Sequence, residues 1–71
     1  MKRIKIESSS IKSIGYDWEW SRLEVEFTRG AVYRYEKVYP ETVCHLLFAD
    51  SIGRYFSKHI AINYKYERID K

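Results

Sequence analysis

Apolar and polar residues alternate most regularly between residues 23 and 27. Leu23, Val25 and Phe27 occupy every second position, and Glu24 and Glu26 lie between them. A period of two is typical of a β-strand that has one buried and one solvent-facing side. We therefore predict a strand here, with its apolar side packed on a core.

A second extended segment is predicted before this strand, because β-branched residues recur between positions 4 and 14. Simple alternation would place Ile11, Ser13 and Gly15 on one side of it, and Ile14 and Tyr16 on the other. Residues 17–21 are predicted to form a loop, because an aspartate, here at position 17, commonly starts a turn.

A third strand is predicted after a turn at residues 28–30. A two-residue turn at Arg29 and Gly30 would place the charge of Arg34 on the apolar face. A three-residue loop, with Gly30 in the left-handed conformation of a bulge, shifts the register by one residue and avoids this. We prefer the second register, which puts Ala31, Tyr33 and Tyr35 on the Leu23 side and Arg34 beside the glutamates.

The second half of the chain changes to helical periodicity. Pro40 is typical of a first helical turn, and Glu41 complements the positive end of the helix dipole. Val43, Leu46 and Leu47 form an apolar stripe. We expect Cys44 and Phe48 to widen this stripe on the core side. A second helix, with Asp50 and Ser51 as possible caps, carries five residues at helical spacing: Ile52, Tyr55, Phe56, His59 and Ile60.

Residues 64–69 are extended again, with Tyr64, Tyr66 and Arg68 on one side. The whole pattern predicts an α+β domain spanning residues 1–71. It consists of a three-stranded antiparallel sheet, two short helices on one face of that sheet, and an extended C-terminal tail. Tyr33 and Tyr35 are expected to be core residues beneath the helices rather than a ligand platform.

Composition predicts a small folded domain without disulfides. The chain has 71 residues, of which 45% are hydrophobic and 17% aromatic, so it is a single folded domain rather than a disordered one. A single cysteine cannot form an intrachain disulfide, which fits a reducing compartment, and we expect the cytoplasm. The N-terminus lacks the apolar region of a signal peptide, and no apolar run is long enough to span a membrane.

Charge is distributed unevenly along the chain. Residues 1–12 carry four bases and one acid, residues 13–50 carry four bases and seven acids, and residues 51–71 carry five bases and two acids. The net charge of +3 therefore comes from two basic ends around an acidic middle. Such an asymmetry is compatible with a phosphate-facing surface and equally with an ordinary solvated one.

The residue types needed for catalysis or metal binding are sparse. His45, His59 and Cys44 have no metal-ligand spacing, and we expect no metal. Ser8, Ser9 and Ser10 lack a nucleophile motif, Cys44 is expected to be buried and unreactive, and no glycine-rich phosphate loop occurs. We therefore expect no enzymatic activity and no cofactor.

Binding residues are concentrated in the last third of the chain. Phosphates need lysine or arginine, and bases stack on aromatic rings. The candidate ligand-binding residues are Arg34, Arg54, Lys58, Tyr64, Lys65, Tyr66 and Arg68. Trp18 and Trp20, in the predicted loop, are candidates for an interface, because large apolar side chains are costly to expose. A homo-oligomer is expected on this ground.

Five segments in order, SSSIKSIGYD, LEVEF, VYRY, YFSKHI and YKYERI, resemble the KTSC domain from about Ser8 to Ile69. This family is named for the C-terminal extension of some lysyl-tRNA synthetases and also occurs as small free-standing proteins. Its hallmark corresponds to Tyr33-Arg34-Tyr35. The resemblance implies no established catalysis and suggests RNA binding. Ala61 and Ile62 replace an Arg-Gly pair common in the family, and Lys65 replaces a proline.

Two function classes follow from these observations. The first is a non-enzymatic module for a nucleotide-type ligand, either RNA or a small phosphorylated nucleotide held by an oligomer. The alternative is a protein–protein interaction module or small inhibitor, of the kind that compact phage and bacterial genomes encode. Strong salt dependence would favour the first, and a salt-tolerant apolar contact through Trp18 and Trp20 would favour the second.

Overall fold

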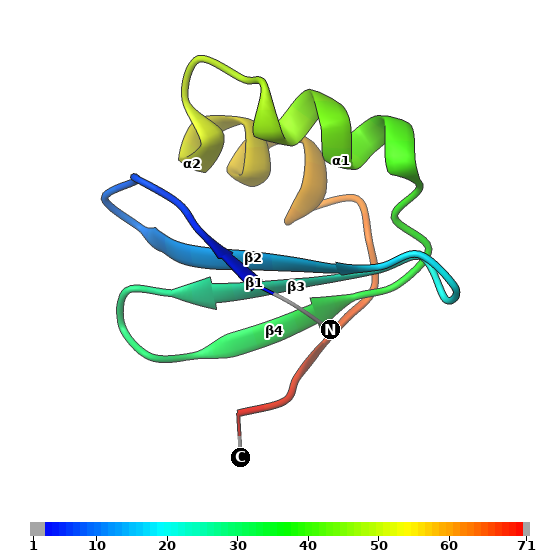
Figure 1. Cartoon of the computed structure of the whole chain (residues 1–71). Helices are drawn as coiled ribbons and strands as arrows, with labels where there is room; N and C mark the ends of the chain where they lie inside the picture. Colours follow the sequence, from blue (N-terminus) through cyan, green and yellow to red (C-terminus); the bar gives the residue numbers. More distant parts are fainter. Residues whose placement is uncertain (1–2, 71) are drawn as a thin grey trace.

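A computed structural model describes residues 3–70, which form one antiparallel sheet with helices on one of its faces (Figure 1). The strands are β1 (Arg3–Lys5), β2 (Ile11–Asp17), β3 (Arg22–Phe27), β4 (Val32–Tyr35) and β5 (Tyr66–Arg68). The helices are α1 (Pro40–Leu47), α2 (Ile52–Tyr55) and the π-helical segment η1 (Phe56–Ile60), which continues α2. The expected α+β class, with an antiparallel sheet and two helical regions, is confirmed.

The sheet has five strands in the order β1-β2-β3-β4-β5, so the prediction of three strands was wrong. The predicted C-terminal tail is strand β5, which pairs with β4 and brings Tyr66 opposite Tyr35. The N-terminal segment forms β1, which pairs with β2. Both additional strands are three-residue edge strands, and all their residues are exposed. A segment of three residues is too short to show a period of two. Such a segment becomes a strand through pairing with its neighbour rather than through its own sequence.

The preferred hairpin register between β3 and β4 is confirmed. Val25 lies opposite Tyr33, and Glu24 lies opposite Arg34. The N–H of Phe27 donates to the carbonyl of Ala31 across the three-residue loop, and Gly30 has a φ of 103°. Glycine adopts this left-handed conformation without the steric cost that a side chain would add.

Strand β2 departs from simple alternation through a bulge. Ile11 lies opposite Phe27, whereas Ser13 lies opposite Glu26, so Lys12 is the extra residue. Ile11 and Ile14 therefore both face the helices, and the prediction that they occupy opposite sides was wrong. Ser13 faces away from the helices, where its hydroxyl donates to Glu26 at 2.8 Å.

The face of the sheet without helices carries a lattice of ion pairs. Arg3 on β1 lies two strands from Glu24 on β3, yet its Nη2 is 2.7 Å from a carboxylate oxygen of that residue. Gly15 on β2 is the residue between them in this row. Because Gly15 has no side chain, the guanidinium can reach across β2 to the glutamate.

Helix α1 begins at Pro40, as predicted, and buries Val43 and Leu46 against the sheet. Cys44 is exposed and Phe48 is 88% exposed, so the prediction that they widen the buried stripe was wrong. Positions 44 and 48 lie about 100° and 140° around a helix from position 43, and they therefore turn away from the sheet.

The two tyrosines of β4 belong to the core, as predicted. Tyr35 is 2% exposed and meets Phe56 of η1 edge-on, with ring centroids 5.3 Å apart. Tyr33 is half-buried and packs against the same core. Burial, with smaller contributions from the neighbouring Tyr66 and Tyr33, raises the pKa of Tyr35 to about 12. These rings connect the sheet to the helical layer.

Candidate functional site

The predicted ligand-binding residues do not form one cluster. Two of the arginines are held by carboxylates. Arg34 contacts Glu36 at 3.3 Å and Glu67 at 2.9 Å on the face without helices. Arg68 contacts Asp70 at 2.8 Å. An anionic ligand would have to compete with these carboxylates at both positions.

The pair formed by Arg68 and Asp70 is anchored further by the backbone. The N–H of Val32 donates to Asp70 at 3.2 Å. The hydrogen bond from Arg68, followed by that from Val32, lowers the pKa of the Asp70 carboxyl to about 2. Arg68 therefore closes the end of β5 rather than presenting a free cation.

The remaining tail residues are divided between the core and the surface. Tyr66 stacks on Tyr33, with ring centroids 5.2 Å apart and an interplanar angle of 22°. Tyr64 is half-buried against the core, whereas Lys65 is exposed. Tyr64 and Tyr66 thus hold the tail against the rest of the fold, while 57% of Tyr66 remains exposed.

Arg54 and Lys58 are different, because both are exposed and neither forms an ion pair within residues 3–70. They border a shallow hollow of ≈ 260 Å³ beside the start of α2. Tyr55 and His59 line the same hollow, and their ring centroids are 4.4 Å apart. We name these four residues, Arg54, Tyr55, Lys58 and His59, the α2–η1 surface.

The local sequence explains how this surface is formed. Ser51 caps α2, because its hydroxyl accepts a hydrogen bond from the N–H of Arg54 at 3.3 Å. Phe56 and Ile60 are buried beneath the helix and leave the polar residues of α2 and η1 on the outside. The helix widens to π-helical hydrogen bonding at this point, a local distortion often found at functional sites.

Two members of the α2–η1 surface were not among the predicted site residues. The sequence places Tyr55 and His59 at helical spacing with the core residues of this segment. In the structure His59 is exposed. The signal that could have identified them is their spacing of four, which stacks their rings on one helix face.

Trp18 and Trp20 are both exposed, at 70% and 65%, but they have different surroundings. Trp18 meets Tyr16 edge-on, with ring centroids 5.0 Å apart. The guanidinium of Arg22 lies over the ring of Trp20, with its carbon 5.3 Å from the ring centroid, and Arg22 also pairs with Glu36. The two indoles therefore border different parts of the surface.

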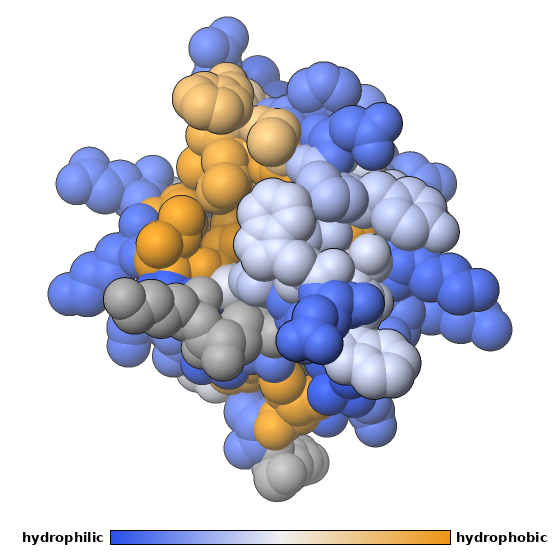
Figure 2. All heavy atoms as spheres, turned by 45° about the vertical axis from the view of Figure 1, so that its right-hand side comes forward, coloured by the Kyte–Doolittle hydropathy of each residue, from blue (hydrophilic) through white to orange (hydrophobic). Residues whose placement is uncertain are grey.

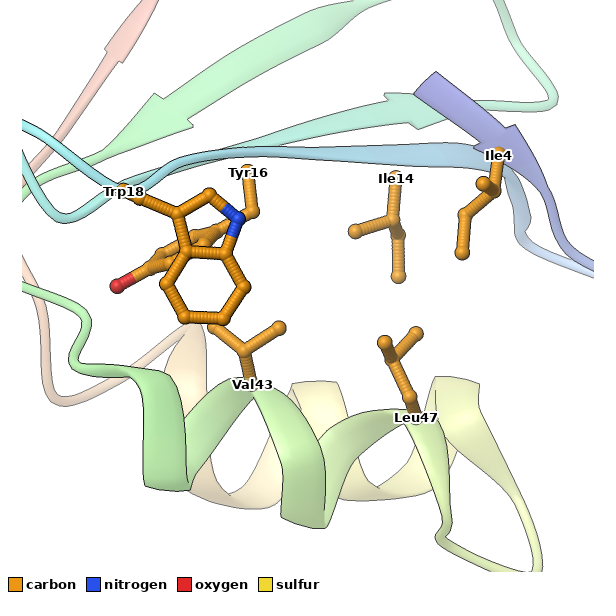
Figure 3. Close-up of a pocket in the computed structure, with 6 residues that line it drawn as sticks. All are labelled: Ile4, Ile14, Tyr16, Trp18, Val43 and Leu47. Carbon is orange, nitrogen blue, oxygen red and sulfur yellow. The ribbon is translucent and has the colours of Figure 1, made fainter. Parts of the chain in front are cut away.

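An apolar groove of ≈ 370 Å³ separates β1 and β2 from α1 (Figure 3). Figure 2 shows apolar side chains reaching the surface together on one face of the molecule, with paler aromatic side chains beside them. The hydroxyl of Tyr16 is turned to the carbonyl of Val38, so the groove interior is apolar. The lining residues are Ile4, Ile14, Tyr16, Trp18, Val43 and Leu47.

Residues 3–70 contain no group of three or more histidine, cysteine, aspartate or glutamate side chains placed to hold a metal ion. In the same part of the chain, the helices fall short of the length and apolar character needed to cross a membrane.

Comparison with known proteins identifies the family. The model of the KTSC domain matches residues 7–64. An uncharacterized protein from Stutzerimonas stutzeri is 55% identical over 71 residues, which cover 99% of this chain and 100% of that protein. The lysine–tRNA ligase of Nostoc punctiforme is 38% identical over 66 residues, which cover 93% of this chain but only 12% of the ligase.

A crystal structure gives the same assignment. The KTSC domain protein from Yersinia pestis superposes with a TM-score of 0.90 at 33% identity, and the match covers 96% of each chain. The resemblance of the sequence segments to this family is thus supported by the family model, by related sequences and by the shared fold. This chain belongs to the KTSC domain family.

Proposed function

We propose that this domain is a non-enzymatic binding module for a nucleotide-type ligand, and that the α2–η1 surface is its contact site. The proposal rests on two exposed cations, Arg54 and Lys58, that have no carboxylate partner within residues 3–70. They lie beside the rings of Tyr55 and His59. Cations contact phosphates and rings stack on bases, so this surface offers both contacts that such a ligand needs.

Two further observations support this choice of site. Asp50 lies at the rim of the same hollow, where its carboxylate can accept a hydrogen bond from a ribose hydroxyl or an exocyclic amine. A related domain occupies 12% of the lysine–tRNA ligase of Nostoc punctiforme, whose name gives tRNA as its substrate. We extend this association with RNA to the present chain and place the domain in the cytoplasm.

The double substitution Arg54→Ala/Lys58→Ala is expected to weaken binding of a single-stranded RNA oligonucleotide at least about tenfold at low salt. Each lost phosphate contact should also reduce the slope of log K against log salt by about 0.7, so the pair should reduce it by about 1.4. Fluorescence anisotropy at several salt concentrations measures both quantities. Mono-, di- and cyclic nucleotides are titrated in parallel to separate RNA from a small nucleotide.

The matched control is Lys5→Ala/Lys12→Ala, which removes the same charge from other elements. Lys5 lies opposite Ser13, and Lys12 is 3.9 Å from Glu26, so both belong to the face of the sheet without helices. This control should bind RNA nearly as well as the wild type. Equal weakening by both double variants would contradict a localised site, and no binding at low salt would contradict the function itself.

We also propose self-association, because the large exposure of Trp18 and Trp20 is unusual for a monomeric surface. Light scattering should give a mass above that of one chain at high concentration. Trp18→Ala or Trp20→Ala should lower this mass toward the monomer. A strictly monomeric protein at all concentrations would refute the proposal.

A further inference from the structure

Among residues 3–70, strand β1 lies at one edge of the sheet and pairs on one side only, with β2. The N–H of Ile6 donates to the carbonyl of Lys12 on β2 at 3.0 Å, so Ile6 and Ile4, two residues earlier, turn their backbone groups toward β2. Adjacent residues of a strand turn their backbone groups in opposite directions. The N–H and C=O groups of Arg3 and Lys5 therefore point away from β2, to this edge.

The side chains along this edge have a defined chemical pattern. Arg3 and Lys5 lie opposite Gly15 and Ser13 on the face without helices, whereas Ile4 lies opposite Ile14 on the helix side. Ile4 is 53% exposed and forms the outer wall of the apolar groove next to Leu47 (Figure 3). The edge is therefore apolar on one side and carries two cations on the other. Arg3 is paired with Glu24 at 2.7 Å, whereas Lys5 forms no ion pair within residues 3–70.

We propose that this edge binds an extended acidic–apolar segment of another protein, which adds a sixth strand to the sheet beside β1. Residues paired across a sheet share a face. A partner residue opposite Lys5 would thus lie beside an unpaired cation, and one opposite Arg3 would share that guanidinium with Glu24. The residue opposite Ile4 would cover the apolar groove from its outer side. The segment that complements this pattern has acidic residues on either side of a large apolar one.

The charges also argue against a second copy of this chain as the occupant of the edge. Two β1 strands paired antiparallel about Ile4 would place Arg3 of one copy opposite Lys5 of the other. Like charges directly opposite one another destabilise a strand pair.

Main-chain hydrogen bonds supply much of the affinity when a peptide joins a sheet edge, and the alternating side chains supply the specificity.

The test uses two labelled synthetic peptides titrated by fluorescence anisotropy into the full chain. In the first, glutamates alternate with isoleucines; in the second, lysines replace the glutamates. The first peptide should bind at least about threefold more tightly, because only its charges complement Lys5 and the guanidinium that Arg3 shares with Glu24. Amide signals of Arg3 and Lys5 should shift in NMR spectra, whereas those of the α2–η1 surface should not.

Variants at Lys5 separate the backbone contact from the charge. Lys5→Pro removes an N–H that points away from β2, so the β1–β2 hydrogen bonds remain. It should weaken the acidic peptide about fivefold to tenfold more than Lys5→Ala, which removes only the charge. Lys5→Glu should reduce or reverse the preference between the two peptides, and this result does not depend on the folding of the proline variant.

Three results would overturn the proposal. The acidic peptide could bind no better than the basic one, or Lys5→Glu could leave the preference unchanged. Alternatively, sedimentation could show a dimer that dissociates in Lys5→Glu, which would assign the edge to a second copy of this chain.

Discussion

Replacing Tyr35 with alanine is expected to remove a large fraction of the protein's free energy of unfolding, and to unfold the chain where the total is near the low end of its range. The Tyr35 ring contacts Phe56, Tyr66 and Tyr33, with centroid distances of 5.3, 5.4 and 6.4 Å. Loss of a buried aromatic ring typically costs about 3–5 kcal/mol. A domain of 71 residues has a total stability of only about 4–11 kcal/mol. Circular dichroism during thermal and urea unfolding measures the loss.

Phe48→Ala is the matched control for this experiment. It also truncates an aromatic ring, but Phe48 is 88% exposed at the end of α1. The free energy of unfolding should change by less than about 0.5 kcal/mol, as for most surface substitutions. Equal stability of the two variants would show that the packing of Tyr35 contributes little to the fold.

The second large effect is a loss of stability at alkaline pH caused by Tyr35. Its pKa is about 12 in the folded protein because burial disfavours the phenolate, whereas the unfolded value is 10.0. The unfolded chain therefore releases this proton first as the pH rises. The contribution is fully present below pH 10 and is lost between pH 10 and pH 12. Two pH units correspond to at most about 2.7 kcal/mol, and screening by solvent near the hydroxyl reduces the expected loss to about 1–2 kcal/mol.

Tyr35→Phe isolates this contribution from the lysines and other tyrosines that titrate in the same range. The free energy of unfolding of the wild type, relative to that of Tyr35→Phe, should be constant below pH 10. It should fall by that amount between pH 10 and pH 12. Urea unfolding at fixed pH values measures it. An ultraviolet titration should show one late phenol in the wild type that is missing in the variant. A constant difference up to pH 12 would contradict the assignment.

Local sequence information was enough for the centre of the fold. The period of two in residues 23–27, together with the need to keep Arg34 off the apolar face, predicted the β3–β4 register that the structure shows. Gly30 supplied the left-handed residue that this loop needs. Pro40 and the apolar stripe around Val43 predicted α1. In each case one short stretch contains both the periodicity and the turn chemistry, so no distant partner has to be known.

Information from one segment was insufficient wherever two distant segments meet. β1 and β5 are strands only because they form backbone hydrogen bonds with β2 and β4. The bulge in β2 is likewise defined by the pairing of β2 with β3. Three residues alone cannot express a period.

The candidate binding site shows the same division. Composition identified the lysines, arginines and tyrosines of the last third of the chain, but it could not distinguish paired cations from unpaired ones. Tertiary structure brings Glu67 and Glu36 to Arg34, and Asp70 to Arg68, while Arg54 and Lys58 remain on an exposed helix face. The sequence by itself thus determined the residue types that can bind a ligand. Only the fold decided which of them are available, because an ion pair depends on distances between strands that are far apart along the chain.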